Sequence, residues 1–125
     1  MKIAIGTDHR GFAHKEFITQ HISSVEWIDV GAYTADRTDY PVYAEKVVEL
    51  IVSQQAVYGV LLCASGGGMA IAANRHPHIY AVVAWNVEIA RQCKSDDNAN
   101  VLVLPSDFVT QFPAEIIDLL HVHLI

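Results

Sequence analysis

The sequence has few cysteines, few basic residues and no long apolar run, and each shortage excludes a class of protein. Its two cysteines, Cys63 and Cys93, lie far apart, which excludes a disulfide framework and a Cys-x-x-Cys pair. Eight Lys and Arg against 14 Asp and Glu give a net charge of −6, which argues against a general nucleic-acid binder. No apolar stretch reaches the roughly 18 residues of a membrane span, and the opening apolar run is short for a signal peptide. These shortages predict a cytoplasmic protein with no nucleic-acid or membrane partner.

Hydrophobic residues are abundant, and their pattern predicts strands alternating with helices. At 52% hydrophobic and 18% charged residues the chain is expected to fold, and its 125 residues suit a single domain over 1–125. The apolar runs predict strands over 2–6, 25–30, 58–63, 79–85 and 101–104, and helices over 11–22, 41–53, 69–74, 86–94 and 113–123. Strands that are each followed by a helix pair in parallel, with helices on both faces. The expected fold is a three-layer α/β/α Rossmann-like sandwich with a five-stranded parallel sheet.

A glycine-rich loop follows the most apolar predicted strand. Cys63 ends that strand, and Ser65, Gly66, Gly67 and Gly68 lead into the next helix. Free amides at a helix N-terminus can donate hydrogen bonds to an anion or a developing oxyanion, and a thiol beside them ionises more readily than a free cysteine. This arrangement suits a negatively charged intermediate such as an enediolate. The alternative is a tight turn with Cys63 as an inert buried residue.

Asp8 and His9 follow the first predicted strand, so they are expected at the same edge of the sheet as Cys63. A carboxylate can accept hydrogen bonds from sugar hydroxyls, and an imidazole can shuttle protons near neutral pH. The alternative is that Asp8 caps the helix that follows.

Together these residues resemble the type B ribose-5-phosphate isomerases and the related galactose-6-phosphate isomerase subunits. The resemblance covers residues 1 to about 120 and is carried by KIAIGTDHRGF over 2–12, TDYPVYA over 38–44, CASGGG over 63–68, IAAN over 71–74 and ANVL over 99–102. It implies interconversion of an aldose phosphate and a ketose phosphate through a cis-enediolate, without metal or organic cofactor. It also implies a homodimer or homotetramer whose sites lie between subunits.

The resemblance assigns roles to individual residues. Cys63 is the expected base that moves a proton between C1 and C2. Ser65 and the amides of Gly66, Gly67 and Gly68 are expected to hold the enediolate oxygens. Asp8 is expected to bind sugar hydroxyls and help to open the ring. The expected substrate contacts also include His9, Arg10, Tyr43 and Asp97.

Two stretches depart from the family pattern and leave the substrate open. Asp96-Asp97-Asn98 stands where the family has His-Asn-Asp, and Pro105-Ser106-Asp107 stands where it has Gly-Ser-Arg. An aspartate in place of an arginine removes a bidentate phosphate donor, which leaves Arg10 as the best-placed cation. The alternatives are a different sugar phosphate, a sugar acid, an unphosphorylated sugar, or a non-catalytic or partner-dependent sugar-binding paralogue.

Overall fold

The computed structural model describes residues 1–109, and the predicted helix over 113–123 lies outside them. The elements in chain order are β1 (Lys2–Thr7), the short 3-10 helix η1 (His9–Gly11), α1 (Phe12–His21), β2 (Glu26–Asp29), α2 (Tyr40–Val52), β3 (Tyr58–Cys63), α3 (Gly67–Asn74), β4 (Ala81–Val83), α4 (Val87–Ser95) and β5 (Val101–Pro105). No helix among them is long and apolar enough to cross a membrane.

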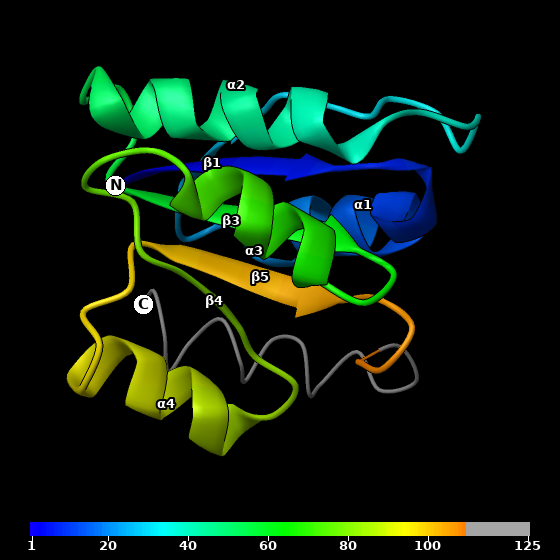
Figure 1. Ribbon diagram of the computed structural model, residues 1–125. Helices are drawn as coiled ribbons and strands as arrows, with labels where there is room; N and C mark the ends of the chain where they lie inside the picture. The colour runs from blue at the N-terminus through cyan, green and yellow to red at the C-terminus, as the bar shows by residue number, and fades with distance from the viewer. Residues whose placement is uncertain (110–125) are drawn as a thin grey trace.

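The five strands form one parallel sheet in the order β2-β1-β3-β5-β4 (Figure 1). The central strand β3 is almost entirely buried, as its continuous apolar sequence predicts for a strand covered on both faces. Its register pairs Leu62 with Thr7 of β1 and Cys63 with Pro105 of β5. The carboxyl ends of these three strands therefore lie side by side at one edge of the sheet.

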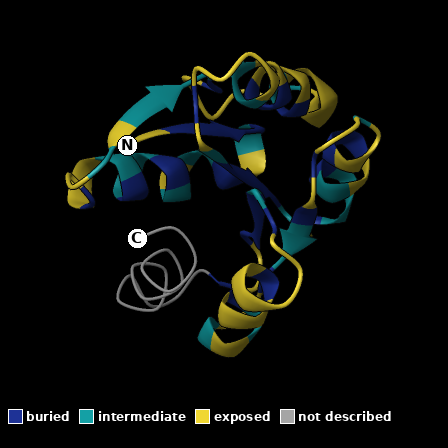
Figure 2. Cartoon of the chain, turned by 90° about the vertical axis from the view of Figure 1, so that its left-hand side faces the viewer, coloured by how far each residue is buried: buried dark blue, intermediate teal, exposed yellow. Residues whose placement is uncertain are grey.

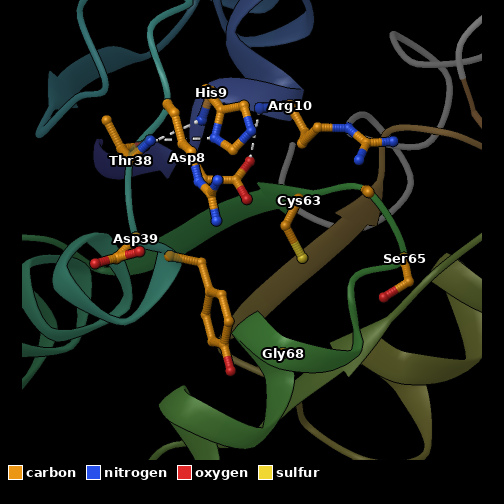
Figure 3. A pocket seen from close by; sticks show the side chains of 11 residues that line it. Asp8, His9, Arg10, Thr38, Asp39, Cys63, Ser65 and Gly68 are labelled. Atoms are coloured by element: carbon orange, nitrogen blue, oxygen red, sulfur yellow. Dashed lines mark hydrogen bonds between the residues drawn. The ribbon is translucent and has the colours of Figure 1, made fainter.

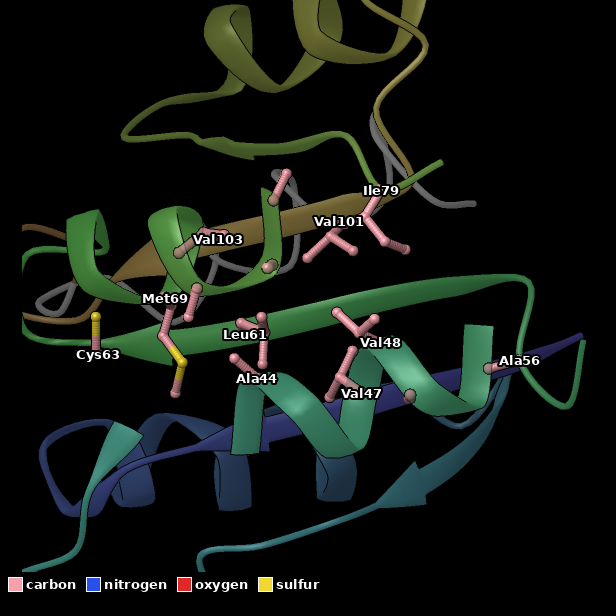
Figure 4. Packing of buried hydrophobic residues seen from close by; sticks show 14 residues of the cluster. Ala44, Val47, Val48, Ala56, Leu61, Cys63, Met69, Ile79, Val101 and Val103 are labelled. Carbon is pink, nitrogen blue, oxygen red and sulfur yellow. The ribbon is translucent and has the colours of Figure 1, made fainter. Parts of the chain in front are cut away.

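Helices cover both faces of the sheet, so the predicted three-layer fold is confirmed. Alternate strand residues point to opposite faces. Ile5 and Leu62 pack with Ile18 of α1 on one face, in a cluster that also includes Ala90 of α4. On the other face, Leu61, Cys63, Val101 and Val103 pack against α2 and α3, together with residues such as Val47 and Met69 (Figure 4). Buried residues concentrate between the helix layers, and exposed residues lie on the outer faces of the helices (Figure 2).

Two elements differ in length from the sequence-based expectation. Strand β4 covers Ala81–Val83 instead of 79–85, and just before it the amide of Tyr80 donates to the Asn100 side chain at 2.9 Å. Helix α3 begins two residues before the expected start at Met69, because Gly66 takes a left-handed φ of +82° at its N-cap. Gly67 and Gly68 therefore belong to the first turn of the helix, although glycine has low helix propensity.

Candidate functional site

A cavity of about 490 Å³ opens at the carboxyl-end edge of the sheet (Figure 3). This is the edge where open parallel sheets bind ligands. Three segments supply the described lining residues: Asp8, His9 and Arg10 after β1; Arg37, Thr38, Asp39 and Tyr40 before and at the start of α2; and Cys63, Ala64, Ser65 and Gly68 after β3. The structure therefore brings the Asp8–His9 pair and the Cys63 loop together, as the sequence predicts.

Cys63 is the last residue of β3, and its thiol points toward the cavity (Figure 3). The residue is only 5% exposed, because its side chain also packs in the core layer under α2 and α3. Its carbonyl accepts a 2.8 Å hydrogen bond from the amide of Ser106, which fixes the loop after β5 against the end of β3. A reactive group placed in this way is held by the rigid centre of the fold.

The first turn of α3 presents hydrogen-bond donors beside Cys63. Gly68 lines the cavity, and as the second residue of α3 its amide has no acceptor within the helix. The amide of Gly67 is already engaged, because it donates to Ser65 Oγ at 3.3 Å. The Ser65 hydroxyl is exposed and keeps its own proton to donate. Ser65 and Gly68 thus both line the cavity and both carry a hydrogen-bond donor.

Gly66 has a structural task instead. It adopts a positive φ, and an added Cβ would lie 3.0 Å from Cγ1 of Val83 and 3.3 Å from Cγ1 of Val103. Neither Gly66 nor Gly67 lines the cavity. Gly66 therefore serves the tight turn that was the alternative interpretation of this loop, whereas Gly68 lines the cavity.

Asp8 has both of the roles considered for it. It caps the 3-10 helix, since its Oδ1 accepts from the amide of Arg10 at 2.9 Å, and it also lines the cavity. The residue is 6% exposed, so its remaining acceptor capacity is available mainly to a ligand in the cavity.

His9 is held in one orientation by Thr38. The Thr38 amide donates to His9 Nδ1 at 3.2 Å, and Thr38 Oγ1 accepts from the His9 amide at the same distance (Figure 3). Because Nδ1 is an acceptor, the neutral ring carries its proton on Nε2. His9 therefore offers a hydrogen-bond donor from its free ring nitrogen.

The prediction that Tyr43 lines the pocket is not supported by the geometry, and Tyr40 lies there instead. A Cβ added to Gly31 would lie 3.0 Å from Tyr43 Cε1, and Lys46 Nζ lies 5.6 Å from the Tyr43 ring. Tyr40 begins α2 at the carboxyl-end edge, and its ring covers Gly68.

Sequence reasoning also missed the roles of Arg37, Thr38 and Asp39 as lining residues. They occupy the loop after β2, which in a parallel sheet ends at the same edge as β1 and β3. Their position after a predicted strand could therefore have indicated that they line the cavity.

The structure does not bring Asp97 to the cavity of its own chain. Asp97 follows α4, which runs back toward the amino ends of the strands, and precedes β5. It lies near Cys93, where burial and then the Asp97 charge raise the pKa of the Cys93 thiol. Asp97 is therefore at the edge of the sheet opposite Cys63.

The Arg10 guanidinium extends away from Asp8, toward the loop after β5 (Figure 3). There its Nη2 lies 2.9 Å from Oδ2 of Asp107, with both side chains about half exposed. The cation expected to contact a phosphate group is thus paired with a carboxylate of the same chain. Among residues 1–109, no group of three His, Cys, Asp or Glu side chains could hold a metal ion.

The sequence of the chain matches known proteins along most of its length. The family model described as Ribose/Galactose Isomerase matches residues 3–120. Ribose-5-phosphate isomerase B of Escherichia coli is 39% identical over 110 residues, which cover 86% of this chain and 74% of the relative. A putative sugar phosphate isomerase of Rickettsia conorii is 36% identical over 111 residues, covering 87% and 77%.

Solved structures agree with these matches. A ribose 5-phosphate isomerase of Thermotoga maritima superposes with a TM-score of 0.92 at 39% identity, covering 98% of this chain and 85% of that one. Ribose-5-phosphate isomerase B of Mycoplasma genitalium, solved with bound ribulose-5-phosphate, gives a TM-score of 0.89 at 31% identity, covering 98% and 82%. The chain belongs to the Ribose/Galactose Isomerase family.

Proposed function

We propose that this chain is a cofactor-independent aldose–ketose isomerase of a sugar phosphate, of the ribose-5-phosphate/ribulose-5-phosphate type, with Cys63 as the base. The observation that carries the proposal is the position of the Cys63 thiol, which faces a cavity beside the helix amide of Gly68 and the hydroxyl of Ser65. Relatives known as ribose-5-phosphate isomerase B, one of them solved with bound ribulose-5-phosphate, support the same substrate class.

The proposed reaction moves one proton between neighbouring carbons. The Cys63 thiolate removes the proton from C2 of the open-chain aldose, and the electron pair of that bond forms a double bond between C1 and C2. The carbonyl electrons move onto O1, which becomes an oxyanion. Return of the proton to C1, with transfer of the O2 proton to O1, leaves the carbonyl at C2 and completes the ketose.

The negative charge of the enediolate is stabilised by donors already aimed at the cavity. The Gly68 amide lies at the positive end of α3, and the Ser65 hydroxyl lies one turn before it. Such donors need no reorganisation when the charge develops. Gly66 and Gly67 act through the shape of the turn, because their own positions lie outside the cavity lining.

Asp8 and His9 bind the sugar hydroxyls at the opposite wall. The buried Asp8 carboxylate accepts from a hydroxyl, and the Nε2 proton of His9 is donated to a sugar oxygen. Asp8 also helps to open the ring by taking the proton of the anomeric hydroxyl. Asp97 contacts the substrate only if a second copy of the chain supplies it, since in its own chain Asp97 lies at the edge of the sheet opposite Cys63.

Solvent deuterium exchange tests the chemistry directly. The protein is incubated in D₂O with a panel of aldoses, aldose phosphates and their ketoses, and deuterium at C1 and C2 is followed by NMR. We expect incorporation into a sugar phosphate with the wild type, and its loss in Cys63→Ala. Cys93→Ala is the matched control, because Cys93 is equally buried but remote from the cavity.

Two outcomes would overturn the proposal. Full incorporation with Cys63→Ala would remove Cys63 from the mechanism. No incorporation from any sugar with a folded wild-type protein would favour the binding module or the partner-dependent subunit, which would show as ligand-induced thermal stabilisation without turnover.

A further inference from the structure

The ion pair between Arg10 and Asp107 joins two loops at the rim of the cavity. Arg10 lines the cavity after β1, and Asp107 follows β5. Their side chains meet at 2.9 Å. An exposed ion pair of two flexible side chains often has little energetic weight, so its significance depends on how the backbone holds it.

The backbone holds both partners in place. The amide of Asp107 donates to the carbonyl of Ala64 at 3.0 Å, directly beside Cys63. Ser106 is buried, and its Oγ donates to the carbonyl of Arg10 at 3.4 Å. The backbone of Asp107 is therefore held beside that of Arg10 by contacts at the edge of the cavity, so the two side chains start from neighbouring positions.

This carboxylate changes the charge that a ligand meets. The described lining holds two arginines, Arg10 and Arg37, and two aspartates, Asp8 and Asp39, so its formal charges cancel. Asp107 adds one negative charge at the rim, and it does so beside one of the two cations. A ligand group with two negative charges, such as a phosphate, must compete with Asp107 for Arg10.

We propose that Asp107 is a specificity-determining residue that weakens the affinity of the cavity for a phosphate group by occupying Arg10. The inference deepens the proposed function and rests on the cavity being its substrate site. It assigns to this chain a sugar ligand that is held mainly through its hydroxyl groups, by Asp8, His9 and the Cys63 loop. The phosphate end then contributes less to binding than the number of arginines suggests.

Anion binding tests this without relying on turnover. Inorganic phosphate and unphosphorylated ribose are titrated separately into the protein at about pH 7.5, where most of the phosphate is the dianion, and the affinity is read from NMR chemical shifts. Asp107→Asn removes the charge and keeps the shape of the side chain. Glu26→Gln makes the same change of charge at the amino end of β2, the edge away from the cavity.

For Asp107→Asn we expect phosphate to bind about tenfold more tightly, the effect of one charge about 5 Å from a dianion in water-like screening. Ribose affinity should stay within about twofold, and Glu26→Gln should match the wild type, since exposed charges farther away than about 10 Å are screened. The double variant Arg10→Gln with Asp107→Asn should bind phosphate about as weakly as the wild type, because it removes one positive and one negative charge from the rim together.

Three results would overturn the proposal: phosphate affinity unchanged or weaker in Asp107→Asn, an equal gain in Glu26→Gln, or a gain that persists in the double variant. Failure of the proposed function is a separate result. A protein without deuterium exchange that still gains phosphate affinity through Asp107→Asn would retain this binding role and lose the isomerase assignment.

Discussion

The contact between Gly68 and Tyr40 gives a sharp test of the cavity wall. A Cβ added to Gly68 would lie 2.8 Å from Cζ of Tyr40, and ordinary contact begins at 3.4 Å, so the ring must retreat by about 0.6 Å. Tyr40 is 39% exposed and can move outward at a cost of about 1 kcal/mol, the lower end for overpacking. Replacing glycine by alanine in the first turn of a helix returns at most the roughly 0.5–1 kcal/mol of a mid-helix position. Gly68→Ala should therefore leave the free energy of unfolding within about 1 kcal/mol of the wild-type value.

Activity should respond far more strongly than stability to the same change. The added methyl group and the displaced ring alter the wall beside the Gly68 amide, and sub-ångström misplacement of a bound substrate costs about 10- to 100-fold in rate. We expect kcat/KM for the sugar phosphate to fall by that factor, measured by the deuterium exchange assay or a coupled ketose assay. Gly67→Ala is the matched comparison, because its Cβ would meet only Ser65 Oγ at an ordinary 3.6 Å. Equal losses in the two variants, or full activity in Gly68→Ala, would refute this account of the cavity wall.

Two further predictions concern ionisable groups that are fully or partly buried. Lys15 is fully buried, with Nζ 2.6 Å from Asp29 and 3.1 Å from Glu16. Asp29→Asn should lower the free energy of unfolding by about 2 kcal/mol in urea denaturation, because it leaves the buried Lys15 ammonium without its nearest charged partner. Lys15→Met should lower the free energy of unfolding by less, about 1 kcal/mol, because the carboxylate of Asp29 is partly exposed and can be hydrated. The reverse order would contradict this reasoning. Burial lowers the pKa of His14 below 6.5, although the Asp107 charge opposes the shift. The neutral His14 ring therefore makes its full contribution to the free energy of unfolding above pH 6.5. This contribution declines as the pH falls from 6.5 toward the lower pKa of the folded protein, because the unfolded chain binds a proton first. Thermal unfolding across this range should depend less on pH in His14→Leu, and an unchanged slope would argue against a neutral, partly buried His14.

The sheet and the glycine-rich loop after Cys63 could be predicted because local sequence patterns specify both. The run from Tyr58 to Cys63 is apolar throughout, as a strand between two helix layers requires, and the glycines that follow mark the turn into a helix. Since the carboxyl ends of parallel strands share one edge, the meeting of Asp8 with Cys63 followed from the topology alone.

The choice between Tyr40 and Tyr43 could not be made in this way. Residues three apart lie on the same side of a helix, one turn from each other, so periodicity does not tell which turn reaches the cavity. The answer depends on where α2 begins relative to the sheet edge, which is a tertiary property. The Arg10–Asp107 pair joins residues 97 positions apart, and no local pattern reports such a contact.

The position of Asp97, by contrast, was available from the predicted order of elements. Residues that follow a strand lie at the carboxyl-end edge, whereas Asp97 follows a helix and precedes β5. Resemblance alone placed it among the substrate contacts. In a single chain the topology separates it from Cys63, and only a second copy could bring the two together.

The two tasks of the site are placed on different loops, and this separation has a consequence for substrate choice. In the proposed reaction, the donors for the enediolate come from the loop after β3 and the first turn of α3, which are fixed by the core through Cys63 and Met69. The charge at the rim comes from Arg10 and Asp107, which are about half exposed. Under both proposals, a change of charge at position 107 therefore alters the affinity of the cavity for a phosphate group without moving the groups assigned to the proton transfer. For Asp107→Asn the expected kinetic effect is accordingly on KM for a phosphorylated sugar, with kcat preserved, because the ion pair contacts neither reacting carbon.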